Sequence, residues 1–196
     1  MTTIELEYES RSMISEEKYF EIASNFYHED SYLKTITQKN QYFDNEDYYL
    51  TNNNMVLRIR ITNKGAVLTL KIAEEDGHCK EISQKISYFQ HKALIEKSHF
   101  PKGQIKLLLM AKGIPLMSLK YICEMKTKRI QINAKNYNYC IDKNEYCGIA
   151  DYNIEVEAHS MEEADKIMKD LSIKYNFEIS KEYIVKSRRA ILYEKR

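Results

Sequence analysis

The stretch Ile4-Glu5-Leu6-Glu7-Tyr8-Glu9-Ser10-Arg11 decides how the rest of the chain is interpreted. Successive strand residues point to opposite faces, so in a strand the three glutamates and Arg11 would form a row with a spacing of about 7 Å. Like charges in such a row repel one another, and the row is tolerated either in water or opposite metal ions and basic side chains. The stretch therefore predicts a strand with one charged face, and it leaves open whether that face is a solvated edge or the lining of a cavity.

Length and composition are those of an ordinary globular protein. The chain has 196 residues, of which 43% are hydrophobic and 30% charged, with a net charge of +1. No linker or low-complexity tract divides it, which predicts a single domain over residues 1–196. The balanced charge gives no overall attraction to nucleic acid or to an anionic membrane. Without a long apolar run or an apolar leader, we expect a cytoplasmic protein with neither kind of partner.

The cysteines and histidines do not form a recognisable metal motif. No CxxC pair and no histidine cluster is present, so neither a zinc site nor a disulfide framework is predicted. We expect any metal to be held by oxygen ligands. We expect buried thiols at the four cysteines, Cys79, Cys123, Cys140 and Cys147.

Alternating segments predict an antiparallel sheet whose strands each have one apolar and one charged face. The stretch Val56-Leu57-Arg58-Ile59-Arg60-Ile61 places its two arginines on one face. A turn at 63–65 leads into a return strand that carries Lys71 on its polar face. Further strands are expected over 35–44, 79–88 with Glu81, 119–134 with Arg129, 137–146, and 151–158 with Asn153, Glu155 and Glu157 on one face.

Helical spacing separates these strands in several places. Ser15 is placed to cap a helix that follows it, and Ser160 with Glu163 forms a capping-box pattern. Further helical segments are expected over 89–95, 104–112 and 186–192. Eight or so strands with a few helices predict an α+β fold, and their single charged faces favour closure of the sheet.

Closure with the charged faces inward would bring acidic and basic side chains into one cavity. Arginine would bind phosphate oxygens there in bidentate fashion, and carboxylates would hold hard divalent cations. Charged faces turned outward would instead give a solvated sandwich. Periodicity alone does not distinguish the two arrangements.

An ordered series of short motifs runs through the chain. It begins with Glu7-Tyr8-Glu9-Ser10-Arg11 and continues with Tyr42-Phe43-Asp44, Leu57-Arg58-Ile59-Arg60, Leu68-Thr69-Leu70-Lys71, Thr127-Lys128-Arg129, Ile141-Asp142-Lys143, Asp151-Tyr152-Asn153-Ile154-Glu155-Val156-Glu157, and Lys186 with Arg189. The series resembles the CYTH, or triphosphate tunnel metalloenzyme, superfamily, and most of all its YjbK-like bacterial branch. That superfamily has an ExExK signature, whose lysine is Arg11 in this chain.

The resemblance implies a closed eight-stranded antiparallel β-barrel, a tunnel with helices packed outside, that acts on triphosphate compounds with Mg²⁺ or Mn²⁺. It assigns catalysis to Glu7, Glu9 and Arg11. It assigns metal binding to Glu7, Glu9, Glu155 and Glu157, with Glu81 as an additional acidic residue. It assigns substrate binding to Arg11, Arg58, Arg60, Lys71, Arg129 and Lys186.

The implied activity is hydrolysis of inorganic triphosphate or of an organic triphosphate such as thiamine triphosphate. Two alternatives stay open at this point. One is an adenylate cyclase of the same superfamily, which would need an adenine pocket. The other is a non-catalytic polyphosphate or nucleotide binder, suggested by Arg11 in place of lysine and by Asn153 where many relatives have a carboxylate. A homodimer is also implied, because members of the superfamily often pair.

Overall fold

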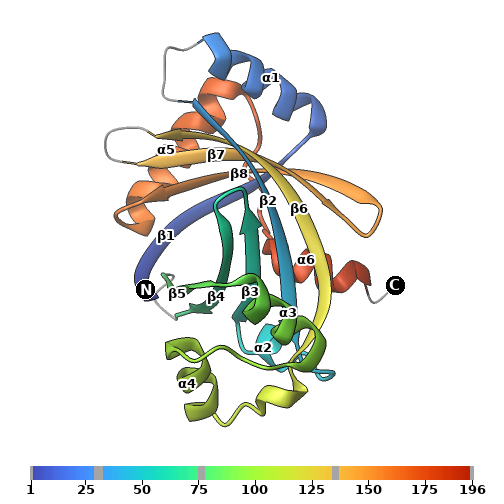
Figure 1. Ribbon diagram of the computed structural model, residues 1–196. Helices are drawn as coiled ribbons and strands as arrows, with labels where there is room; N and C mark the ends of the chain where they lie inside the picture. Colours follow the sequence, from blue (N-terminus) through green and yellow to red (C-terminus); the bar gives the residue numbers. More distant parts are fainter. Residues whose placement is uncertain (1, 29–32, 75–77, 134–136, 195–196) are drawn as a thin grey trace.

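The structure, a computed structural model, describes residues 2–28, 33–74, 78–133 and 137–194. Its centre is a closed antiparallel barrel with the strand order β1-β5-β4-β3-β2-β6-β7-β8 (Figure 1). The strands are β1 (Thr2–Ile14), β2 (Leu33–Asp44), β3 (Met55–Thr62), β4 (Gly65–Ala73), β5 (Cys79–Ile86), β6 (Lys120–Asn133), β7 (Asn138–Tyr146) and β8 (Ile149–Ala158). The predicted α+β class and eight-stranded barrel are confirmed. Residue 134, at the end of a predicted strand, lies outside the described residues, and the single domain over 1–196 stays a prediction.

Strand β1 closes the barrel because its two halves pair with different neighbours. Its first half pairs with β5, where Glu5 lies opposite Glu81. Its second half pairs with β8, where Glu9 lies opposite Glu157 and Arg11 opposite Glu155. The acidic stretch identified in the sequence therefore lies between the two ends of the sheet and joins them.

The charged faces of the strands point into the barrel. The alternate, apolar residues of β3 and β4, such as Leu57, Ile59 and Leu68, pack outward into a buried cluster with Leu94 and Ile105. Burial of these apolar faces against helices fixes the strand register, since a one-residue slip would turn every charge outward. The question that periodicity left open is therefore answered in favour of a charged interior.

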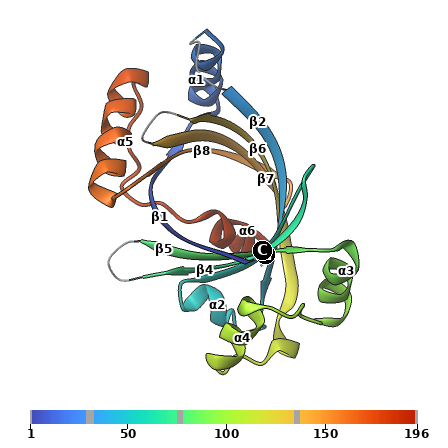
Figure 2. The same ribbon diagram turned by 60° about the vertical axis from the view of Figure 1, so that its left-hand side comes forward.

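Helices cover the outside of the barrel in two groups (Figures 1 and 2). The first group packs outside β6, β7 and β8 around buried residues such as Ile22, Ile154 and Met168. It comprises α1 (Glu16–His28) and α5 (Met161–Tyr175). The second group lies near β3, β4 and β5 and comprises α2 (Tyr49–Asn52), α3 (Tyr88–Lys97) and α4 (Gln104–Ala111). Within the described residues, no helix has the length and apolar character needed to cross a membrane.

The predicted helix caps are present, with one difference in their bonding. The Ser15 hydroxyl accepts a hydrogen bond from the Lys18 N–H at 3.1 Å, and the Ser160 hydroxyl accepts one from the Glu163 N–H at 3.2 Å. The Glu163 carboxylate accepts from the His159 N–H, one residue before the cap, and this differs from a regular capping box. A regular capping box, which the sequence pattern did not single out, joins Ser87 and Gln90 at the start of α3.

The last helix, α6 (Lys186–Glu194), lies inside the ring of strands (Figure 2). Its Ala190 and Ile191 pack against Tyr42 and Met125, which point inward from β2 and β6. The expectation that helices pack outside the barrel therefore holds for the other five helices and differs for α6. This helix fills one end of the tunnel.

Candidate functional site

One wall of the tunnel, made by β1 and β8, is acidic. Glu9 and Glu157 are cross-strand partners, and Arg11 and Glu155 are the next inward-facing pair. Arg11 forms an ion pair with Glu9, and its Nε atom lies 3.9 Å from a carboxylate oxygen of Glu155. Glu157 is exposed and forms no ion pair with the described residues. Negative charge is therefore in excess where Glu9 and Glu157 meet.

A second group of charges, the Lys71 cluster, joins β1, β3, β4 and β5. It consists of Glu7, Arg58, Lys71 and Glu81. The Lys71 ammonium contacts the carboxylates of both Glu7 and Glu81, and it lies 3.0 Å from Glu81 Oε2. Arg58 Nη2 lies 3.2 Å from the same oxygen, and the Ser83 hydroxyl donates to the other oxygen of Glu81 at 2.9 Å.

The two carboxylates of the Lys71 cluster are shifted in opposite directions. Burial raises the pKa of Glu7, although Lys71 opposes the shift, and the nearby Glu81 charge raises it further. Burial also favours the neutral form of Glu81, but Arg58 and Lys71 outweigh it and lower the pKa of Glu81 to about 2. Glu81 is therefore the carboxylate that holds the shared positive charge, and Glu7 is the one that takes up a proton first.

Strand β3 presents two guanidinium groups that are incompletely neutralised. Arg60 donates from Nε to Asn40 Oδ1 at 3.0 Å and forms no ion pair with the described residues. Burial, together with the charges of Arg58 and Arg129, lowers the pKa of Arg60 to about 9. The Nε atom of Arg58 is buried without a hydrogen-bond partner. These donors suit an anion that brings its own negative charge into the tunnel.

A third group, the Lys186 cluster, consists of Arg129, Asp142, Glu155 and Lys186. Arg129 binds Asp142 through two parallel hydrogen bonds, at 2.8 Å from Nε and 2.7 Å from Nη2, and Nη2 also lies 2.5 Å from Glu155. Lys186, the first residue of α6, contacts Asp142 and lies 2.7 Å from Glu155 Oε1. Burial alone would raise the pKa of Glu155, but Lys186 and Arg129 hold it well below its usual range.

Two members of this region have no role in the sequence-based assignment. Asp142 is fully buried at the centre of the Lys186 cluster. Cys140 Sγ lies 3.8 Å from Glu155 Oε2, and it forms with Asp142 and Glu155 a group whose ligand atoms lie within 4.8 Å of one another. The alternation of Cys140, Asp142 and Asn144 on β7 was the available signal, since alternate strand residues share a face. A sulfur donor thus stands beside the oxygen ligands that were expected.

The expectation of buried thiols is correct for two of the four cysteines. Cys123 and Cys140 are buried, whereas Cys79 is half-buried and Cys147 is exposed. Cys147 lies in the tight turn between β7 and β8 with a positive φ of 47°, and its thiol donates to Glu194 Oε2 of α6 at 3.3 Å. All four are free thiols in the structure.

Asn153 points inward from β8 and is fully buried. Its amide oxygen accepts a hydrogen bond from Asn144 Nδ2 at 2.8 Å, and its own Nδ2 has no partner. The oxygen that could coordinate a metal is thus directed to Asn144. Asn153 lies beside the acidic wall without contributing charge to it.

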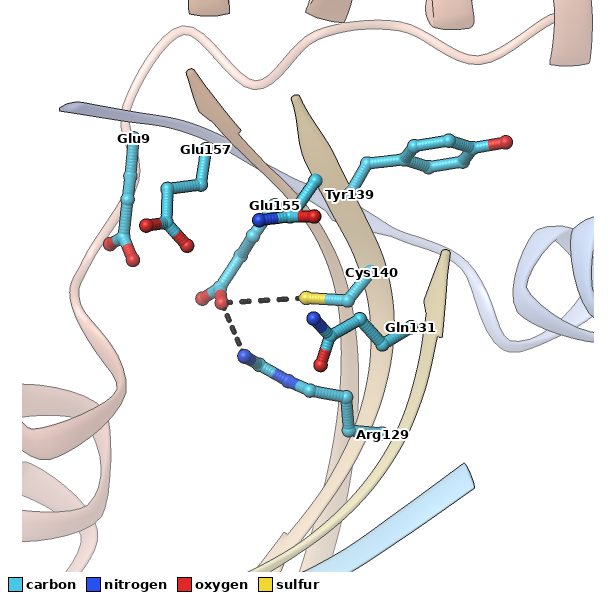
Figure 3. A pocket seen from close by; sticks show the side chains of 8 residues that line it. Glu9, Arg129, Gln131, Tyr139, Cys140, Glu155 and Glu157 are labelled. Carbon is cyan, nitrogen blue, oxygen red and sulfur yellow. Dashed lines mark hydrogen bonds and ion pairs between the residues drawn. The ribbon is translucent and has the colours of Figure 1, made fainter. Parts of the chain in front are cut away.

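A small, open pocket lies between the acidic wall and Arg129 (Figure 3). Figure 3 shows the carboxylates of Glu9 and Glu157 side by side, with Glu155 between them and Arg129. The ring of Tyr139 points away from these groups. The pocket is lined by Glu9, Arg129, Gln131, Asn138, Tyr139, Cys140, Glu155 and Glu157.

The structure thus brings every residue of the sequence-based assignment into the barrel interior, although in separate groups. The Lys71 cluster contains Glu7, Arg58 and Glu81, and the Lys186 cluster contains Arg129 and Glu155. The remaining ones are Glu9 and Glu157 at the pocket, Arg11 beside them, and Arg60 on β3.

A closed barrel with acidic and basic side chains facing each other across its interior defines a charged β-tunnel. The model of the CYTH domain matches residues 5–187, so this chain belongs to the CYTH domain family. The predicted resemblance is therefore confirmed.

Individual relatives agree with the family assignment. Over 174 residues the chain is 29% identical to a Bacillus subtilis (strain 168) protein named "Putative triphosphatase YjbK", covering 86% of this chain and 88% of the relative. A crystal structure described as a "putative adenylate cyclase" from Bacillus halodurans is 29% identical, with a TM-score of 0.86 over 95% of this chain and 97% of the other. A Hippeastrum protein, described as "Putative adenylyl cyclase HpAC1" with a dominant triphosphatase activity, shares the fold at 18% identity, with a TM-score of 0.75 over 93% and 92% of the two chains.

Proposed function

We propose that this protein hydrolyses triphosphate compounds inside its β-tunnel with the help of Mg²⁺ or Mn²⁺. The observation that carries the proposal is the pair Arg58 and Arg60 on β3, which share the barrel interior with the acidic wall. Arg58 is buried with its Nε unpaired, and Arg60 is half-buried and forms no ion pair with the described residues. The description of the Bacillus subtilis relative as a "Putative triphosphatase" supports the same reaction. Inorganic triphosphate and organic triphosphates such as thiamine triphosphate are the candidate substrates.

The acidic side chains fit a hard divalent cation. Mg²⁺ and Mn²⁺ prefer carboxylate oxygen, and Glu9 and Glu157 offer adjacent carboxylates at the pocket. Glu7, Glu155 and Glu81 would complete the acidic set from the neighbouring clusters. A bound cation would neutralise phosphate charge and lower the pKa of a coordinated water.

The basic side chains would bind and orient the triphosphate. Arg58 and Arg60 present guanidinium donors that match phosphate oxygens. Arg129 and Lys186 are held by Asp142 and Glu155, so they are positioned before any substrate arrives. Such preorganised charge stabilises negative charge that develops on a transferred phosphoryl group. Lys71 and Arg11 would add contacts from β4 and β1.

Two other functions keep a specific observation in their favour. The Bacillus halodurans relative is described as a "putative adenylate cyclase", but the only aromatic side chain that lines the described pocket, Tyr139, points away from its centre. A non-catalytic binder is favoured by Asn153, whose amide brings no charge to the acidic wall. Measurement of the reaction products separates the three functions.

The test is release of phosphate and of pyrophosphate from inorganic triphosphate, thiamine triphosphate, ATP and GTP, with Mg²⁺ or Mn²⁺. We expect phosphate release from at least one of them, abolished in the double variant Glu7→Gln, Glu9→Gln. Glu124→Gln, a change on the outer face of β6, is the matched control and should keep full activity. Pyrophosphate with cyclic nucleotide as products would select the cyclase, and tight binding without turnover would select the binder.

A further inference from the structure

Helix α6 carries a second buried cation that has no part in the assigned site. Arg189 is 8% exposed and binds Asp151 in bidentate fashion, at 2.7 Å from Nε and 3.0 Å from Nη2. Its Nη1 donates to the carbonyl oxygen of Ile184 at 2.6 Å, which ties down the residues just before the helix. Asp151 also accepts hydrogen bonds from the Tyr146 hydroxyl at 2.6 Å and from Asn144 at 2.9 Å. The pair is therefore held by three partners, two on β7 and one in the loop before α6.

The position of Arg189 relates it directly to Lys186. Residues three apart on a helix lie on the same face, so both side chains leave α6 on the side that meets the strands. Lys186 reaches Glu155, and Arg189 reaches Asp151, four residues earlier on the same inward face of β8. Strand β8 thus receives both inward-facing cations of the helix, Lys186 at the Lys186 cluster and Arg189 away from it.

We propose that Asp151 and Arg189 are positioning residues that hold the Lys186 ammonium at Asp142 and Glu155. The proposal rests on the proposed function for its kinetic consequence alone. Lys186 is the first residue of its helix, and helix ends fray unless they are tied down. A lysine side chain also has many rotamers and no directional fork of its own, whereas the planar guanidinium of Arg189 fixes its partner's orientation. The ion pair between Arg189 and Asp151, called the anchor below, therefore fixes the start of the helix from which the Lys186 side chain extends.

The first test measures chemical access to Lys186 in the full chain without substrate. Acylation by acetic anhydride, mapped by mass spectrometry, should be several-fold faster at Lys186 in Arg189→Gln and in Asp151→Asn than in the native protein. Arg188→Gln, a change of the exposed neighbour on the same helix, is the matched control and should leave the rate unchanged. Lys71 serves as an internal reference, since it is paired on a different wall.

The second test is a double-mutant cycle on triphosphate hydrolysis. Arg189→Gln should lower kcat/KM about tenfold in the native background and have little further effect when Lys186→Met is already present, because the anchor acts through the lysine. Equal effects in both backgrounds would overturn the proposal. Faster labelling at both Lys186 and Lys71 would also overturn it, since the barrel as a whole would then have loosened. The variants could also show faster labelling at Lys186 alone while the native protein hydrolyses no triphosphate. That result would support the positioning role of Asp151 and Arg189 and contradict the proposed function.

Discussion

At the scale of single residues, the unusual feature is one ammonium group shared by two carboxylates. Lys71 contacts Glu7 and Glu81, while Arg58 reaches Glu81 alone. Arg58, as a second cation beside Glu81, accounts for the opposite shifts in the pKa of Glu7 and Glu81. Glu7 is therefore a carboxylate that forms an ion pair and whose charge nevertheless opposes folding.

The two acids should respond oppositely to neutralisation in metal-free buffer at pH 7. The pKa of Glu81 falls from 4.5 to about 2 on folding, so its charge stabilises the fold above pH 4.5, and that stability is lost as the pH falls towards 2. At about 1.4 kcal/mol per unit, Glu81→Gln should lower the free energy of unfolding by about 3 kcal/mol. The pKa of Glu7 is raised, so its charge opposes folding above that pKa, and Glu7→Gln should increase stability.

Urea unfolding of both variants with EDTA present measures these changes. A loss of stability in both would contradict the assignment of the shared charge to Glu81. The native protein should also lose stability between pH 4.5 and 2, and this part of the loss should be absent in Glu81→Gln.

At the scale of elements, α6 is the segment on which the site depends most. It contributes Lys186 to the interior, and it packs Ala190 and Ile191 against inward residues of β2 and β6. A helix inside a charged barrel needs partners for its charged side chains and for its apolar ones. In α6 the first turn provides the charged contact and the second turn the apolar contacts. Packing and charge therefore reinforce each other in this element.

Truncation of Ile191 should therefore be costly. Ile191→Ala should lower the free energy of unfolding by about 2–4 kcal/mol, because it leaves a cavity between the helix and the barrel wall. Leu192→Ala, at the next residue of the same helix and 41% exposed, is the control and should cost well under 1 kcal/mol. Equal costs in guanidinium titrations would show that α6 does not pack inside the ring.

At the scale of the whole molecule, the near-zero net charge conceals a strong internal separation of charge. The described strands place acids on β1 and β8 and arginines on β3 and β6. Folding concentrates these groups in one interior, where screening by salt is weaker than at the surface. The interior, rather than the outer surface, is therefore where an anion gains most.

Inorganic triphosphate should raise the melting temperature even without a divalent cation. A ligand at one hundred times its Kd adds about 2.7 kcal/mol to stability. Arg60→Met removes an unneutralised guanidinium and should reduce the shift. Lys128→Met, a change of a strand lysine on the outer face, is the control that should keep it. Differential scanning fluorimetry measures the shift in melting temperature. An equal shift in both variants would indicate that the anion binds outside the tunnel.

Much of this architecture could be predicted from the sequence because strand alternation and burial specify it together. The charged residues around Glu7, Arg58 and Glu155 were each grouped correctly on one face of their strand, although alternation alone did not show which face points inward. The interior location of α6 could not be predicted, since a short basic helix has the same pattern on an outer surface. Asp142 was quoted in a motif without a role, because its partners Arg129 and Lys186 come from distant segments that only the closed barrel brings together.

Helix α6 packs against Tyr42 and Tyr146 and so occupies one end of the barrel in the part of the chain that the structure describes, whereas Gln131 and Asn138 line the pocket. If the proposed hydrolysis takes place at that pocket, we expect the cleaved phosphate to leave by the route that the next substrate uses. Product and substrate would then compete for this route. We also expect a long polyphosphate to reach the interior with its terminal phosphates alone.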